Sequence, residues 1–309
     1  MAMRAFVFAG QGAQFVGMGK DLADSYTECR DLFARADAAL GRGLSEICFT
    51  GPAEALTRTD NCQPAIFAVS AACYAALKHE RPDLAFAGAA GLSLGEWTAL
   101  YAAGVLNFED TLKILKARGR FMQDTCNAAE GAMLSVIGLS TDAVRALCEG
   151  SGAEMANLNS AQQTVLSGTS AAIAKAETLA KAAGAKMAVR LQVAGAYHSS
   201  LMKPAAERLA EVLASVKFHA PAMPVVANVT GAPHGSPDSI REAMTRQVTS
   251  PVLWQKSIEW FQANGVTEYV ECGPGKLLSG LIKRIDRAAN TLNVQDVETL
   301  KATAAALKG

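Results

Sequence analysis

Several kinds of sequence feature are scarce or missing in this chain of 309 residues, and each absence narrows the class of protein. Aromatic residues make up only 6%, and basic and acidic residues balance at 29 each. No apolar run reaches the length that spans a membrane. Balanced charge gives the chain as a whole no attraction to nucleic acid or to an anionic membrane. We therefore expect a protein that binds neither.

Cysteine spacing argues against a disulfide framework. The seven cysteines are scattered, none forms a C-x-x-C pair, and their number is odd. Reduced thiols in a cytosolic protein fit this pattern better than disulfides or a structural zinc site. The apolar run after Arg4 is interrupted by Gly10 and Gly12, too soon for a signal peptide. We expect a soluble, cytoplasmic protein with no metal and no cofactor.

The segment Gly91-Leu92-Ser93-Leu94-Gly95 is the most informative motif. It lies between an apolar run and a segment with helical spacing, which predicts a strand, a tight turn and a helix, the arrangement called a nucleophile elbow. Such a turn exposes the Ser93 hydroxyl and places the Leu94 amide at a helix N-terminus, where free N–H groups stabilise an oxyanion. A small-residue turn with an unreactive serine is the other interpretation.

A second glycine-containing loop follows the first predicted strand, residues 4–8. In Gly10-Gln11-Gly12 the two glycines suggest a dinucleotide-binding loop, but Phe15 occupies the place of its third glycine. Two interpretations are left open, an ordinary strand-to-helix turn and a loop that points Gln11 into a cleft.

Apolar spacing predicts several helices in the first part of the chain. One covers residues 21–40, a second opens at Gln63-Pro64, and a third begins after an Asn107 cap. Arg118 lies on the apolar stripe of this third helix, and a buried guanidinium needs an anion. A structural ion pair or a side chain that reaches water would satisfy it. So would the carboxylate of a substrate.

From about residue 131 the order of predicted elements becomes β-α-β-β-α-β, which is typical of a ferredoxin-like unit. Its last strand is predicted by residues 187–193, whose alternation indicates a half-buried strand. We predict an α/β fold with a large hydrolase-like subdomain, residues 1–128 and 197–309, built on a mainly parallel sheet. The small subdomain, residues 129–196, is inserted in it.

Only four histidines are present, and one has a favourable position. His198 follows the small subdomain and precedes a helix, so its side chain can face a cleft. His79 lies near a helix end, and His219 and His234 lie in proline-containing loops, so these three are most simply surface residues. His198 is thus the best candidate for a general base.

Taken together, these motifs resemble those of malonyl-CoA:acyl-carrier-protein transacylases of fatty-acid synthesis. The resemblance covers essentially the whole chain, and its strength lies in the joint order of the motifs. They are Phe8-Ala9-Gly10-Gln11-Gly12-Ala13-Gln14, Gly91-Leu92-Ser93-Leu94-Gly95-Glu96, Arg118-Gly119-Arg120-Phe121-Met122-Gln123, Gly195-Ala196-Tyr197-His198-Ser199, Gln247 ahead of Ser250-Pro251-Val252, and Gly273-Pro274-Gly275-Lys276.

The resemblance implies a role for each candidate residue. Ser93 would be the nucleophile and His198 the base, with a backbone carbonyl around Gln247 in place of the usual third carboxylate. The amides of Gln11 and Leu94 would form the oxyanion hole. Arg118 would bind the malonyl carboxylate. Malonyl-CoA and acyl carrier protein would be the partners, in ping-pong transfer by an enzyme that we expect to be a monomer.

One position departs from the family pattern. Leu92 stands where the family usually has histidine before the nucleophile, which predicts altered packing at the site wall. Two other classes remain possible. A serine hydrolase or thioesterase would share the elbow, although Arg118 would then have no evident use. A non-catalytic carrier-protein docking module would share the fold without the chemistry.

Overall fold

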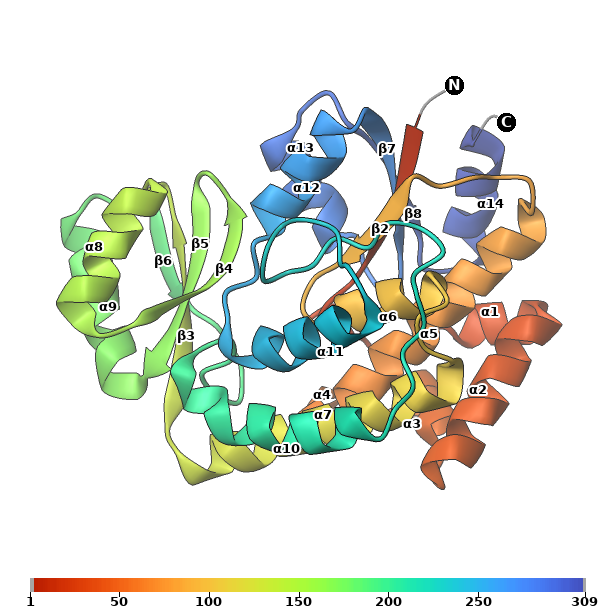
Figure 1. Ribbon diagram of the computed structural model, residues 1–309, viewed down its shortest axis with the longest axis horizontal. Coiled ribbons are helices and arrows are strands. Elements are labelled where there is room, and N and C mark those ends of the chain that lie inside the picture. Colours follow the sequence, from red (N-terminus) through yellow and green to blue (C-terminus); the bar gives the residue numbers. More distant parts are fainter. Residues whose placement is uncertain (1–2, 308–309) are drawn as a thin grey trace.

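Two sheets, each covered by its own helices, form the architecture of the computed structural model, which describes residues 3–307 (Figure 1). The larger sheet is parallel, with the strand order β2-β1-β7-β8. Its strands are β1 (Met3–Phe8), β2 (Gly88–Gly91), β7 (Val266–Cys272) and β8 (Asn290–Val294). Residues 4–8 of β1 are buried on both faces, because helices cover both sides of this sheet.

The helices around the larger sheet come from both ends of the chain. They are α1 (Lys20–Ser25), α2 (Thr27–Leu40), α3 (Leu44–Thr50), α4 (Ala53–Thr57), α5 (Thr59–Glu80), α6 (Leu94–Ala102), α7 (Phe108–Ala128), α10 (Lys203–Ala214), α11 (Pro237–Arg246), α12 (Trp254–Ala263), α13 (Leu277–Ile285) and α14 (Val297–Ala306). Two single 3₁₀ turns, η1 (Ser200–Met202) and η2 (Gln247–Thr249), lie before α10 and after α11.

The prediction of one helix over residues 21–40 was wrong. The chain is extended at Tyr26, with φ −123° and ψ 124°, so α1 ends there and α2 begins. The Tyr26 hydroxyl donates a hydrogen bond to Glu80 on α5 at 2.7 Å. Periodicity could not show this break, because the apolar residues on both sides of Tyr26 face the same core.

The start of α5 also differs from the prediction. The helix begins at Thr59, so Pro64 lies inside it rather than in its first turn. Proline has no N–H to donate to the carbonyl four residues earlier, here that of Asp60. The Arg42 guanidinium donates to this carbonyl instead, at 2.9 Å. A contact between distant residues thus compensates for a helix interruption that the local sequence predicts.

The smaller sheet is antiparallel, in the order β4-β5-β3-β6, and two helices cover one face of it (Figure 1). Its elements are β3 (Gly131–Ile137), α8 (Thr141–Ser151), β4 (Glu154–Ser160), β5 (Gln163–Thr169), α9 (Ser170–Ala182) and β6 (Met187–Arg190). This order is that of a ferredoxin-like unit, and the predicted fold class is confirmed. The boundaries at residues 129 and 196 stay a prediction.

The last strand of the small unit is less buried than its pattern predicts. Ala188 packs against the helix-covered core, whereas Met187, Val189 and Leu191 are 53%, 46% and 37% exposed. β6 is an edge strand whose side chains alternate between this core, where Ala188 packs, and an exposed face, so the alternation is real but the predicted burial was wrong.

Backbone hydrogen bonds join the two units where the segment before α12 meets strand β4. Val252, from the large unit, donates to the Ala156 carbonyl at 2.8 Å and accepts from the Leu158 amide at 2.9 Å. Strand β4 of the small sheet is therefore tied to the segment that precedes α12. Within residues 3–307 no helix is both long enough and apolar enough to cross a membrane.

Candidate active site

Ser93 lies on a strained turn between β2 and α6. Its φ of 53° falls in the left-handed region, which L-residues seldom occupy. A Cβ on Gly91 would lie 2.0 Å from the Gly95 carbonyl carbon, and one on Gly95 would lie 2.1 Å from the Phe8 carbonyl oxygen. The two glycines of the motif are thus required by close backbone approach, and the turn has the geometry of a nucleophile elbow.

Asn228 holds the elbow on both sides of Leu92, just before the Ser93 side chain. Its side-chain amide donates to the Gly91 carbonyl at 2.7 Å, and its oxygen accepts from the Ser93 amide at 2.8 Å. Asn228 is fully buried and lies 135 residues from Ser93 along the chain. Sequence reasoning missed it, because the residue carries no motif of its own.

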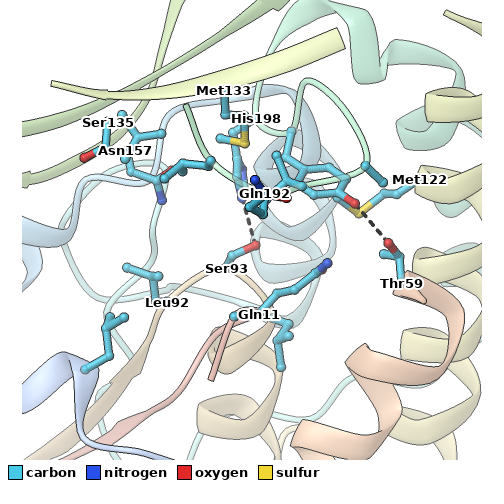
Figure 2. Close-up of a pocket in the computed structure, with 18 of the residues that line it drawn as sticks. Gln11, Thr59, Leu92, Ser93, Met122, Met133, Ser135, Asn157, Gln192 and His198 are labelled. Carbon is cyan, nitrogen blue, oxygen red and sulfur yellow. Dashed lines mark hydrogen bonds between the residues drawn. The ribbon is translucent and has the colours of Figure 1, made fainter. Parts of the chain in front are cut away.

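His198 faces Ser93 directly, as Figure 2 shows, with Nε2 2.8 Å from the Ser93 hydroxyl oxygen. Its Nδ1 lies 2.8 Å from the Gln247 carbonyl oxygen and 3.2 Å from that of Ser250. Carbonyl oxygens only accept, so Nδ1 carries the proton and Nε2 is free to accept from Ser93. The structure thus brings together Ser93, His198 and the segment from Gln247 to Ser250, which are far apart in the sequence.

The environment keeps His198 neutral. Burial away from water, followed by the nearby positive charge of Arg118, lowers the pKa of His198 from 6.5 to about 4. The two carbonyls at Nδ1 act in the opposite direction. At neutral pH the imidazole is therefore unprotonated and able to accept a proton.

Arg118, on α7, is buried next to the same hydroxyl. Its side chain donates to Ser93 Oγ at 3.0 Å, to Gln247 Oε1 at 3.0 Å and to Gln63 Oε1 at 2.7 Å. All three acceptors are neutral, and Nε has no partner among the described residues. Burial lowers the pKa of Arg118 to about 10, against the attraction of Glu96. At neutral pH a cation lies beside Ser93 with no carboxylate in direct contact.

A cavity of about 330 Å³ opens in front of these residues, between the two units. Gln11 and Leu92 lie on the large-unit side, and Ser135 and Asn157 lie on strands of the small sheet opposite them (Figure 2). Leu94, the first residue of α6, also lines the cavity. Within residues 3–307 the amides of Gln11 and Leu94 donate to no backbone carbonyl, so both are free to bind an oxyanion.

The interpretation of His234 as a surface residue was wrong. Its side chain is 2% exposed, and its Nε2 lies 2.7 Å from Glu96 Oε1. Glu96 in turn accepts from Gln247 Nε2 at 2.6 Å. A loop position near a proline gave no sign of this burial, which depends on a contact across 138 residues of sequence. His79 and His219 are exposed as predicted.

A serine on a strained turn with a histidine at 2.8 Å is the arrangement of serine-dependent acyl-group enzymes on parallel α/β sheets. Comparison with known families agrees with this class. The sequence model of the acyl transferase domain family matches residues 5–302, so the chain belongs to this family.

Individual relatives cover the whole chain. It is 42% identical to the malonyl CoA-acyl carrier protein transacylase of Bacillus subtilis (strain 168), over 100% of this chain and 98% of the relative. It is 43% identical to the protein of that name from Escherichia coli (strain K12), over 100% of both chains.

Solved structures show the same fold. The malonyl CoA-acyl carrier protein transacylase from Coxiella burnetii superposes with a TM-score of 0.96 at 36% identity, covering 100% of this chain and 98% of that one. A malonyl-transacylase in complex with its type II PKS acyl-carrier protein superposes with a TM-score of 0.95 at 37% identity, covering 99% of this chain and 100% of that one.

Proposed function

We propose that this enzyme transfers a malonyl group from malonyl-CoA to the phosphopantetheine thiol of acyl carrier protein, through a malonyl ester on Ser93, in fatty-acid biosynthesis. The observation that carries the proposal is Arg118, a buried cation 3.0 Å from Ser93 Oγ whose direct partners are all neutral. An acyl group that carries its own carboxylate would supply the missing anion. The names of the relatives support the same substrates.

In the first half of the reaction Ser93 attacks the thioester. His198 Nε2 takes the hydroxyl proton as Oγ bonds to the thioester carbonyl carbon, and the Gln11 and Leu94 amides donate to the developing oxyanion. When the C–S bond breaks, the leaving thiolate of coenzyme A receives the proton from His198. The Gln247 carbonyl keeps Nδ1 protonated throughout.

In the second half the same atoms work in reverse. The carrier-protein thiol enters the cavity, gives its proton to His198 and attacks the malonyl ester carbonyl. Ser93 Oγ leaves as an alkoxide and recovers a proton from His198. Because both thiols use one site in turn, the kinetics are ping-pong.

Arg118 supplies the selectivity for a dicarboxylic acyl group. A guanidinium fork binds a carboxylate through two parallel N–H···O bonds, and an acetyl group offers neither acceptor. Leu92 stands where the family pattern has histidine, and it lines the cavity. Its apolar side chain can neither donate nor accept a hydrogen bond, so it takes no part in the hydrogen bonding of Ser93 and His198. It therefore shapes the wall and leaves the proton transfer unaltered.

The cellular setting is part of the proposal. All seven cysteines are free, which supports a reducing compartment, and we place the activity in the cytoplasm. Every group assigned a step belongs to one chain, so the proposed mechanism operates in a monomer.

Intact-mass spectrometry tests the function directly. After mixing with malonyl-CoA the protein should gain one malonyl group, which then moves to added acyl carrier protein. Ser93→Ala should gain none, whereas Ser215→Ala, an exposed serine at the end of α10, should behave as the unaltered protein. An adduct that decays to malonate without the carrier would mean a hydrolase. No adduct at all would mean a docking module.

A further inference from the structure

Glu96 is a buried carboxylate that no step of the proposed reaction uses. It lies on α6, is 1% exposed and does not line the cavity. A buried charge is costly unless hydrogen bonds compensate for its lost hydration. Both oxygens of Glu96 are satisfied, Oε1 by His234 Nε2 at 2.7 Å and Oε2 by Gln247 Nε2 at 2.6 Å. The fold thus keeps a charge directly behind the site.

The contact with Gln247 decides which way its side-chain amide points. Nε2 donates to Glu96 Oε2 and, at 2.8 Å, to the Ser93 carbonyl oxygen. Oε1 consequently faces Arg118 and accepts from Nη2 at 3.0 Å. In the opposite orientation Oε1 would meet a carboxylate and a carbonyl, and Nε2 would meet a guanidinium. A carboxylate can only accept, so the charge of Glu96 excludes that orientation.

Gln247 then acts on the two groups that face Ser93. Its side-chain oxygen holds one arm of the Arg118 fork, while Gln63 holds the other. Its backbone oxygen holds His198 Nδ1 at 2.8 Å. One residue therefore positions both the proposed malonyl-binding cation and the proposed base, and its own orientation depends on Glu96.

His234 completes the arrangement from the other side. It reaches Glu96 from a loop after the Val226–Pro233 bridge, and its backbone amide donates to the Val225 carbonyl at 2.8 Å. As a donor at Nε2 it fixes one carboxylate oxygen and leaves the other for Gln247. The charged or titratable groups placed against this carboxylate are His234 itself and, through Gln247, Arg118.

We propose that Glu96 and His234 are a positioning pair for acyl transfer, which sets the orientation of the Gln247 amide and through it the malonyl-selective geometry of Arg118. The proposal rests on the function proposed above. Neither residue touches the substrate or the reacting atoms, so the pair positions the site through Gln247, in addition to the direct attraction between the Glu96 and Arg118 charges.

Glu96→Gln is the first test, because it keeps the shape and removes the charge. A glutamine at position 96 can present either its oxygen or its nitrogen, so the Gln247 amide is no longer restricted to one orientation. We expect kcat/KM for malonyl transfer to fall by about 10- to 100-fold and the malonyl-to-acetyl ratio to fall with it. His234→Ala should act in the same direction, whereas His234→Gln, which keeps a donor, should retain most of the selectivity. Glu211→Gln and His219→Gln, both at exposed positions, are the controls.

A double-mutant cycle separates positioning from general support of the fold. In a Gln247→Ala background the Glu96→Gln change should lower kcat/KM much less than in the unaltered protein, because the side chain that Glu96 orients is gone and the direct attraction for Arg118 alone is lost. Equal losses in both backgrounds would overturn the proposal, as would an unchanged malonyl-to-acetyl ratio in Glu96→Gln with its melting temperature preserved. If the unaltered protein forms no malonyl adduct at all, the proposed function fails instead.

Discussion

At the scale of single residues, the two groups that would exchange a proton share an unusual backbone. Ser93 has φ 53° and His198 has φ 57°, and among residues 3–307 these are the non-glycine residues with positive φ. Such conformations persist where the surroundings impose them, and they are concentrated at functional sites. Here Asn228 holds the first residue, and the Gln247 and Ser250 carbonyls hold the second.

The depressed pKa of His198 predicts an activity that persists in mild acid. The neutral imidazole is the active form, so a pKa of about 4 keeps kcat/KM level from pH 8 down to about pH 5, whereas an ordinary histidine would lose activity below 6.5. Arg118→Gln removes the positive charge beside His198 and should therefore raise the pKa of His198. The acid limb of the pH profile of kcat/KM should then move to higher pH. Acetyl-CoA is the substrate for this measurement, because its transfer does not depend on a carboxylate contact.

Arg118→Lys is the matched control, since it keeps the charge and should leave the acid limb low. If the unaltered protein had lost half of its activity at pH 6.5, the prediction would be contradicted.

The lowered pKa of His198 also has a consequence for stability. As the pH falls from about 6.5 toward 4, the unfolded chain binds a proton that folded His198 does not, so the free energy of unfolding decreases over this window.

At the scale of elements, the elbow depends on backbone contacts that leave no room for a side chain. A Cβ on Gly95 would lie 2.1 Å from the Phe8 carbonyl oxygen on β1, and backbone cannot move aside as a side chain can. We expect Gly95→Ala to lower the free energy of unfolding by roughly 3 kcal/mol or more, and to abolish acylation. Urea denaturation followed by circular dichroism measures the first effect.

Gly280→Ala is the control for the glycine prediction. Gly280 lies inside helix α13, is exposed, and would place a Cβ with no atom within 4 Å. Alanine is the better helix former there, so the variant should gain about 0.5–1 kcal/mol. A Gly95→Ala protein as stable as this control would show that the elbow can shift without cost.

The elbow and the proposed substrate cation were the elements that sequence could predict. Gly91-Leu92-Ser93-Leu94-Gly95 is a local pattern, and Arg118 stands out because it interrupts an apolar stripe. The arrangement of Glu96, His234 and Gln247 could not be predicted in the same way. Its hydrogen bonds join residues 138 and 151 positions apart, and neither helical nor strand periodicity reports on contacts of that kind.

At the scale of the whole molecule, formal charge is zero, so attraction to an acidic carrier protein has to come from a local surface. The segment 276–287 is such a surface, with four basic residues against one acidic residue (Lys276, Lys283, Arg284 and Arg287 against Asp286). It includes Leu277, which lines the cavity and is 53% exposed. Arg284 also donates to Gln163 on β5 at 2.6 Å, so the segment reaches across to the small unit.

This charge distribution predicts which substrate a charge reversal would affect. Replacing Lys276 and Lys283 with glutamate should raise KM for acyl carrier protein severalfold, with a smaller change for malonyl-CoA, because the carrier meets a wider part of the surface. The effect should shrink as salt is added, since both lysines are exposed and screened over about 10 Å at 0.1 M. Lys113 and Lys116, exposed on α7 and outside the segment 276–287, supply the control double reversal. Equal increases in KM for both substrates, or an equal response to the control pair, would place the docking surface elsewhere on the molecule.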